Sequence, residues 1–368
     1  MKKIFYLLSF LLMIGCNNIQ KPVKKGPSLP KHTTPDSAVN GVKENIQYSD
    51  KQLEIFLDSV GHLPTQPLAD ETAFWADSIF KSQLQIDTLI SLKDFNQLKH
   101  AAHTGVIDVK TARRIFRNDS ISYDCNEKDV MSTYKVGKIP LVFYSFGKDK
   151  NSFNEFALCV GDPENCENAY LYFFKGNRII ARHDGYSHYG LNLEHFTNID
   201  GETVVYYITE FDDGSGVWWN NFFFYKYDGN KLIPVLNELQ NGNSQAPSPF
   251  GSRTLWLESF VQKTNPLTIK MVYYQDFPDS SQTGEGVNII NDSTTVKYVW
   301  DEQSKTLKGQ YLDSKISKPQ ILSYYLGDND LLYINAYNKL LKSSLLDKTK
   351  RQFTLNYLNG VKNYYRKN

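Results

Sequence analysis

The sequence LVFYSF at residues 141–146 recurs as LNLEHF at 191–196 and as LWLESF at 255–260. The three stretches share the template L-x-[FL]-x-[SH]-F. A second, apolar stretch and a third, aromatic stretch follow each copy, and a polar turn then leads into a fourth short stretch. Because apolar runs of this length between turn residues are typical of strands, each copy predicts four short antiparallel strands.

Four short strands that repeat about every fifty residues or more are typical of a propeller blade, whose sheet must stack on its neighbours to cover its faces. Within residues 217–226, Trp219, Phe223 and Tyr225 alternate with Trp218, Phe222 and Phe224, which predicts burial on both faces. We therefore expect a mainly antiparallel β body with propeller-like repeats. Only three copies are visible, so a β-sandwich or an open barrel stays an alternative.

Helical patterns flank this β body on both sides. Apolar residues recur at helical spacing over residues 48–118, behind capping residues such as Ser49, Asp70, Ser91 and Asp108. They predict a small helical domain at 48–118, followed by the repeated antiparallel β domain at 119–318. Two further amphipathic stripes predict C-terminal helices at 319–368.

The charge balance excludes one large class of function. Lys and Arg total 41 against 40 Asp and Glu, so the chain has no global field that would concentrate nucleic acid. The aromatic content, 24 Tyr, 22 Phe and 5 Trp, favours pleated and half-buried surfaces. We expect no nucleic-acid partner.

Residues 1–16 read MKKIFYLLSFLLMIGC, with two lysines, an apolar run and then Gly15-Cys16. The apolar run is too short to span a bilayer comfortably and ends at a small residue, as in a removable signal. The stretch from Met13 to Cys16 resembles the lipobox of bacterial lipoproteins. That resemblance implies a signal peptide at 1–15, lipidation of Cys16, and a cell-envelope protein anchored to a membrane. The residue after the cysteine is Asn17 rather than the Asp that retains some bacterial lipoproteins at the inner membrane, which favours the outer membrane. Proline-rich and polar residues at 16–47 predict a disordered tether.

An exported chain meets an oxidising compartment, where thiols tend to pair. Cys159 and Cys166 bracket a short polar turn between strand-like runs, so a hairpin could bring their sulfurs together as a disulfide. The alternative is a pair of small buried side chains. Cys125 has no evident role, and the spacing of the pair does not suit zinc.

In a strand, Ser145, His195 and Ser259 occupy equivalent places in the three copies. They would converge as binding residues if the first strands line one axis, or they would each satisfy a local turn. On the opposite strand face, Glu194 and Glu258 are equivalent, and two carboxylates can divide acid and base roles in glycoside hydrolysis.

His183, His188 and His195 form the densest titratable cluster and are further binding candidates. The spacing does not indicate a metal site, and no cofactor is expected. The common nucleophile, phosphate-binding, dinucleotide and zinc-helix motifs are absent from the sequence.

Three functions compete. The leading hypothesis is a lipid-anchored envelope protein that binds an envelope protein or glycan, or acts as a scaffold, without catalysis. An envelope glycan hydrolase is the alternative enzyme. A third hypothesis is an inhibitor or immunity-type lipoprotein that uses an exposed loop at residues 240–252.

Overall fold

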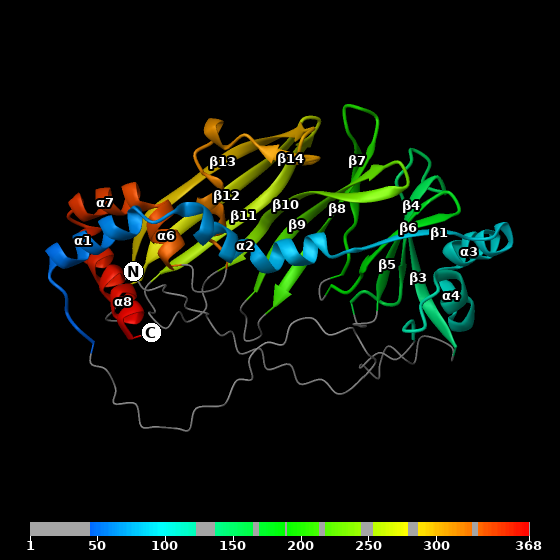
Figure 1. The fold of residues 1–368 in the computed structure, drawn as a ribbon, viewed down its shortest axis with the longest axis horizontal. Coiled ribbons are helices and arrows are strands. Elements are labelled where there is room, and N and C mark those ends of the chain that lie inside the picture. The colour runs from blue at the N-terminus through cyan, green and yellow to red at the C-terminus, as the bar shows by residue number, and fades with distance from the viewer. Residues whose placement is uncertain are drawn as a thin grey trace, which may run out of the picture. The chain divides into compact units, whose positions relative to one another are not determined.

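Two open antiparallel sheets and the helices packed on them make up the structure (Figure 1). The computed structural model describes residues 45–122, 137–164, 169–187, 190–212, 218–243, 253–278, 286–325 and 330–367. The helices are α1 (Asp50–Gly61), α2 (Thr65–Lys81), α3 (Leu92–Thr104), α4 (Val109–Phe116), α5 (Lys318–Leu322), α6 (Asp330–Ala336), α7 (Asn338–Leu346) and α8 (Arg351–Lys367), with a 3-10 helix η2 (Tyr311–Asp313).

The strands fall into two groups. The first sheet has the order β1-β6-β5-β4-β3-β2 and the second the order β14-β13-β12-β11-β10-β9-β8-β7. Their bounds are β1 (Leu84–Leu89), β2 (Val106–Asp108), β3 (Lys138–Ser145), β4 (Glu155–Val160), β5 (Tyr170–Lys175), β6 (Arg178–Asp184), β7 (Glu194–Thr197), β8 (Thr203–Asp212), β9 (Trp218–Asp228), β10 (Lys231–Asn243), β11 (Thr254–Thr264), β12 (Leu267–Phe277), β13 (Val287–Asp301) and β14 (Thr306–Gly309).

Each sequence copy does form four antiparallel strands in chain order, as predicted: β3 to β6, β7 to β10, and β11 to β14. The propeller arrangement is not found. The second and third copies join through pairing of β10 with β11 into one eight-stranded sheet, and neither sheet closes on itself. The unit of four antiparallel strands therefore recurs along the chain, but the three units do not form three separate blades.

The three template leucines lie in different environments, so the three copies are not equivalent. Leu141 lies in β3, in the core shared with α3 and α4, whereas Leu255 lies in β11, in the core shared with the C-terminal helices. Leu191 precedes β7 and is only partly buried, against the core between the sheets. The shared letters mark strand-forming composition rather than one repeated environment.

The predicted two-sided burial of the aromatic strand β9 is confirmed. Phe223 and Tyr225 belong to a core cluster that also contains residues of the first sheet, such as Phe173. Phe222 and Phe224 belong to the other large core of the second sheet. Successive side chains of a strand point to opposite faces, so β9 serves both cores.

Local signals place several helices correctly. Ser49 caps α1 in a reciprocal capping box with Gln52, and Ser91 and Asp108 cap α3 and α4. Gly105 ends α3 in the left-handed conformation, with φ of 72°. The start of α2 at Thr65 lies before the predicted cap at Asp70.

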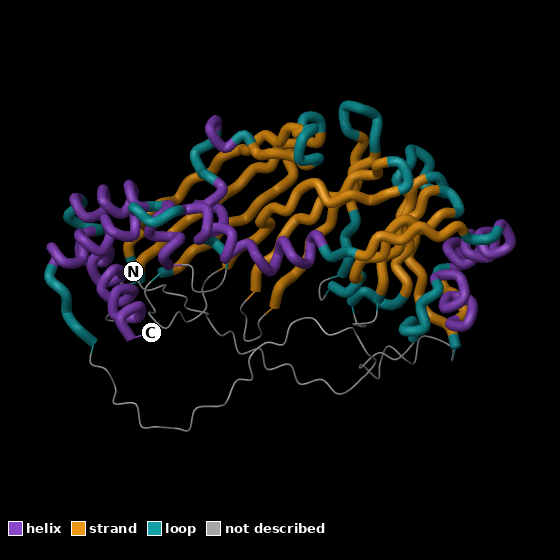
Figure 2. The backbone as a smooth tube through the Cα atoms, in the orientation of Figure 1, coloured by secondary structure: helices purple, strands orange, loops and turns teal. Residues whose placement is uncertain are grey.

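The helices of residues 48–118 do not form a block of their own, in contrast to the predicted small helical domain (Figure 2). Leu53 and Leu57 of α1 enter the core of the second sheet, whereas Leu98 of α3 and Ile115 of α4 enter that of the first sheet. β1 and β2 from the same region complete the first sheet. Residues 45–368 form one compact unit, because these helices cover sheet faces.

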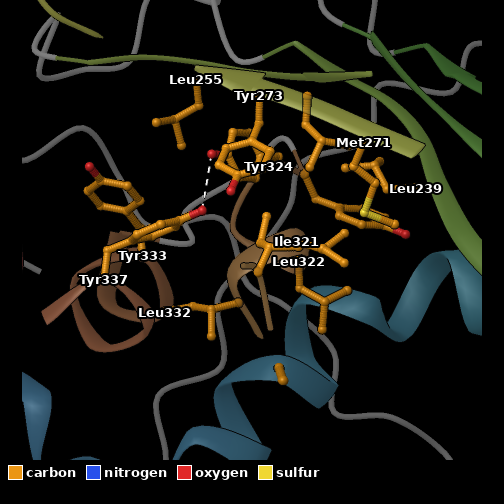
Figure 3. Packing of buried hydrophobic residues seen from close by; sticks show 14 of the residues in the cluster. Leu239, Leu255, Met271, Tyr273, Ile321, Leu322, Tyr324, Leu332, Tyr333 and Tyr337 are labelled. Carbon is orange, nitrogen blue, oxygen red and sulfur yellow. Dashed lines mark hydrogen bonds between the residues drawn. The ribbon is translucent and has the colours of Figure 1, made fainter. Parts of the chain in front are cut away.

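The C-terminal segment folds into α5 to α8, rather than the two helices predicted. Tyr324 of this segment lies against Tyr273 of the second sheet and accepts a hydrogen bond from the Tyr337 hydroxyl at 3.0 Å (Figure 3). The Tyr333 hydroxyl donates to Gln275 of β12 at 3.0 Å. None of the helices in the described part of the chain is both long and apolar enough to cross a bilayer.

Candidate functional site

A cleft of about 470 Å³ lies where the first sheet meets β8 of the second. Its lining residues are Phe146, Gly147, Ser152, Asn154, Glu155, Lys175, Gly176 and Thr203. All except Thr203 come from the two hairpin ends of the first sheet. The volume falls within the roughly 300–1,000 Å³ typical of small-molecule sites.

Ser145 does not line the cleft but holds the turn that carries the lining residue Ser152. Its Oγ lies 2.9 Å from the carbonyl oxygen of Asp149 and 3.1 Å from that of Ser152, so the hydroxyl can donate to either. These contacts hold the turn between β3 and β4 against the end of β3. Ser145 therefore satisfies a turn, which is the local role that the sequence left open for it.

Phe146 links the cleft to both sheets. Its ring centroid lies 6.4 Å from that of Phe173 in the first sheet and 5.9 Å from that of Tyr227 in the second. Its side chain is buried, and this packing fixes the lining segment in place.

One opposite-charge pair faces the cleft. Lys175 Nζ lies 3.4 Å from a carboxylate oxygen of Glu155 and donates to the carbonyl oxygen of Gly229 at 3.0 Å. The two residues are register partners on adjacent strands β5 and β4, which explains why their side chains meet. The cleft thus carries both signs of charge.

His195 lies beside the cleft without lining it. It belongs to β7, and its ring centroid lies 5.4 Å from that of Phe146. Partial burial lowers the pKa of His195, while the nearby Glu194 acts in the raising direction. The imidazole is therefore neutral near pH 7 and can donate or accept a hydrogen bond.

The predicted convergence of the three template positions is not found. Ser145 and His195 both lie near Phe146, but Ser259 lies on β11, where it is the register partner of Met271. The Ser259 hydroxyl is fully buried and has no hydrogen-bond partner among the described residues. Open sheets offer no common axis for the three positions.

Glu194 and Glu258 are also kept apart. Glu194 lies on edge strand β7, and three strands separate it from Glu258 on β11. Neighbouring strands are spaced by about 4.8 Å, so four such steps lie between the two carboxylates. Glycoside hydrolysis uses a pair roughly 5 to 9.5 Å apart. The structure gives this pair no shared site.

His183 is a core residue of the first sheet. Its Nδ1 lies 2.9 Å from the Tyr207 hydroxyl of the second sheet, and 1% of the residue is exposed. Burial lowers its pKa from 6.5 to about 3. His188, the third member of the predicted cluster, lies outside the described residues. Among the described residues, no group of three metal-ligating side chains gathers.

Several predicted features cannot be placed. Cys16, Cys125 and Cys166 lie outside the described residues, as do 244–252 of the loop predicted for an inhibitor. Cys159 lies on β4, fully buried in the core between the sheets, and burial raises the pKa of its thiol to about 12. Cys159 is a free thiol in this structure, so the predicted disulfide with Cys166 is not found.

Sequence reasoning missed the lining residues Glu155, Lys175 and Thr203. Glu155 begins β4 and Lys175 ends the adjacent strand β5, so correct strand bounds would have paired them. The contribution of Thr203 depends on how the two sheets pack, for which the sequence carries no local signal. No family model, curated protein or solved structure matches the chain.

Proposed function

We propose that this chain is a lipid-anchored binding protein of the cell envelope, and that the cleft lined by Phe146, Glu155, Lys175 and Thr203 is its ligand site. The single observation that supports binding is this cleft of about 470 Å³, where the two sheets meet. Ligand sites combine an apolar wall with a few polar groups that converge on it. The cleft has this composition.

The anchor part of the proposal is supported by the lipobox resemblance at Met13 to Cys16. Cys16→Ala should abolish metabolic labelling with a fatty-acid analogue and release the processed chain from the membrane fraction, or leave it unprocessed. Ser28→Ala in the predicted tether is the control and should label normally. Labelling of the Cys16→Ala chain at wild-type level would contradict the anchor.

The binding part needs a readout that does not assume the ligand. A photoreactive benzoylphenylalanine at Asn154, an exposed lining residue, should form an adduct in envelopes that mass spectrometry detects. The same group at the exposed Lys308 on β14 is the matched control. An adduct at 154 alone supports the site, whereas equal or absent adducts at both positions contradict it.

The other two hypotheses have less support. The hydrolase depended on Glu194 and Glu258, which lie on strands separated by three others. The inhibitor depended on a loop that lies mostly outside the described residues.

A further inference from the structure

The polar groups that line the cleft offer both donors and acceptors that the described part of the protein leaves unused. The Asn154 side-chain amide and the Thr203 hydroxyl make no hydrogen bond to any described residue. The Glu155 carboxylate has one partner among those residues, the Lys175 ammonium at 3.4 Å. An amide, a hydroxyl and a carboxylate thus remain open to a ligand.

The charges in the cleft select against a charged ligand. An anion that approached Lys175 would also meet Glu155, and the ammonium already donates to Gly229. A cation that approached Glu155 would meet Lys175 at a similar distance. For either kind of ion, attraction to one member of the pair is offset by repulsion from the other. A charged ligand therefore gains no net Coulomb energy from the pair, and a neutral ligand is favoured.

A neutral ligand must still supply partners for the open groups. Each hydroxyl group both donates and accepts one or more hydrogen bonds, so a polyhydroxylated molecule can serve the carboxylate, the amide and Thr203 together. The buried ring of Phe146 adds an apolar wall against which the carbon atoms of such a molecule can pack.

We infer that the cleft binds a small neutral saccharide, with Glu155, Asn154 and Thr203 as its hydrogen-bonding residues and Phe146 as its apolar wall. This inference depends on the proposed function, because it names the ligand class of the same cleft. Lys175 acts as a positioning residue that orients the Glu155 carboxylate.

The test compares sugars that share a ring and differ in charge. The full chain in detergent micelles is titrated with glucose, N-acetylglucosamine and galactose as neutral probes, and with glucosamine and glucose phosphate as charged ones. Binding is followed by saturation-transfer NMR and calorimetry. At least one neutral sugar should bind more tightly than both charged analogues.

Two variants connect that binding to the cleft. Thr203→Val keeps the shape and strand preference of the residue but removes the hydroxyl, and it should weaken neutral-sugar binding roughly five- to tenfold. Thr268→Val, in strand β12 outside the cleft, should leave it unchanged. Glu155→Gln removes the negative charge and should strengthen binding of glucose phosphate beside Lys175.

Three results would overturn the saccharide inference: no probe binds, a charged sugar binds most tightly, or the two threonine variants behave alike. A cleft-specific photo-adduct at residue 154 obtained alongside any of these would show that the site binds another class of ligand. Loss of that adduct would instead overturn the binding function itself.

Discussion

Gln85 of β1 pairs with the backbone of Leu232 in β10 and so joins the two sheets. Its side-chain amide donates to the Leu232 carbonyl oxygen at 2.6 Å, and its Oε1 accepts from the Leu232 N–H at 3.4 Å. Among the described residues, β11 pairs with β10 only at residues 241–243, and no other strand pairs with the earlier part of that edge. The amide of Gln85 takes the place of a neighbouring strand there, because an amide side chain offers the same donor and acceptor as a peptide group.

Gln85→Ala should lower the free energy of unfolding by about 1–3 kcal/mol, because it leaves the carbonyl and N–H of the buried Leu232 unpaired. Urea unfolding monitored by tryptophan fluorescence measures this. Gln85→Glu keeps the acceptor and places a second acceptor against the carbonyl, so it should be equally destabilising at pH 7 and recover in part near pH 4. Equal stability of Gln85→Ala and wild type would show that the bridge contributes nothing.

The strands and helix caps could be predicted because they depend on nearby residues. The alternation in β9 and the caps at Ser91 and Asp108 involve contacts within a few positions, which the sequence displays directly. β1, by contrast, was missed within the predicted helical region. Its partner β6 lies about ninety residues away, and that pairing has no local signal.

The same distinction between local contacts and contacts without a local signal explains which parts of the candidate site could be predicted. Ser145 contacts residues four and seven positions along the chain, and its turn-satisfying role was one of the sequence's two interpretations. Pairing of β10 with β11 joins the second and third copies into one open sheet and places Ser259 away from the other candidates. The template describes the strands within one copy and carries no signal for pairing between copies. Similar template letters therefore predicted strands but not their arrangement.

Glu238 is a fully buried carboxylate with four donors. Oε2 accepts from the hydroxyls of Tyr298 at 2.8 Å and Tyr311 at 2.7 Å, and Oε1 accepts from Lys318 Nζ at 2.6 Å and the N–H of Leu239 at 3.1 Å. Burial and the Glu238 carboxylate hold the pKa of both tyrosines well above its usual value, so both stay protonated donors. The cluster joins β10 to β13, η2 and α5.

Glu238→Gln should therefore cost about 2–4 kcal/mol of unfolding free energy, because the new amide N–H₂ group faces donors and leaves them unpaired in the core. Lys315→Met is the matched control. Lys315 pairs with Asp292 at 2.7 Å but its side chain is 62% exposed, so its loss should cost less than about 1 kcal/mol. Similar denaturation midpoints for both variants would contradict the role assigned to Glu238.

The thiol of Cys159 offers a test of the predicted disulfide. Burial should protect Cys159 from iodoacetamide in the folded chain whatever its redox state. In guanidinium without reductant, a chain with the Cys159–Cys166 bond should resist alkylation at both residues, and its peptides should be found linked by mass mapping. Alkylation of Cys159 under those conditions is the result expected from the free thiol of this structure, and it would exclude the bond and leave Cys159 as a small core residue. Cys159→Ser serves as the control for the assignment of the peptides.

His183 should make stability depend on pH in a window that its own pKa defines. In the folded chain the centroid of the His183 ring lies 4.7 Å from that of Phe173 and 4.4 Å from that of Tyr225. Its Nε2 has no hydrogen-bond partner among the described residues. Burial lowers its pKa to about 3, whereas the unfolded residue titrates near 6.5. Between those values the unfolded state binds one more proton than the folded state, so the unfolding free energy falls as the pH is lowered from 6.5 toward 3.

The slope should approach about 1.4 kcal/mol per pH unit in the middle of that window, and stability should be insensitive to this residue above pH 7. His183→Gln keeps a neutral hydrogen-bonding group beside Tyr207 but cannot take up a proton. Urea titrations at intervals from pH 7.5 to 4.5 should therefore give converging stabilities as the pH falls, with wild type losing more than the variant. Carboxylates that titrate in acid affect both proteins alike, so the difference between the two curves isolates His183. Parallel curves would mean that the imidazole is solvated in the folded state and that the packing around it is looser than the contacts with Phe173 and Tyr225 imply.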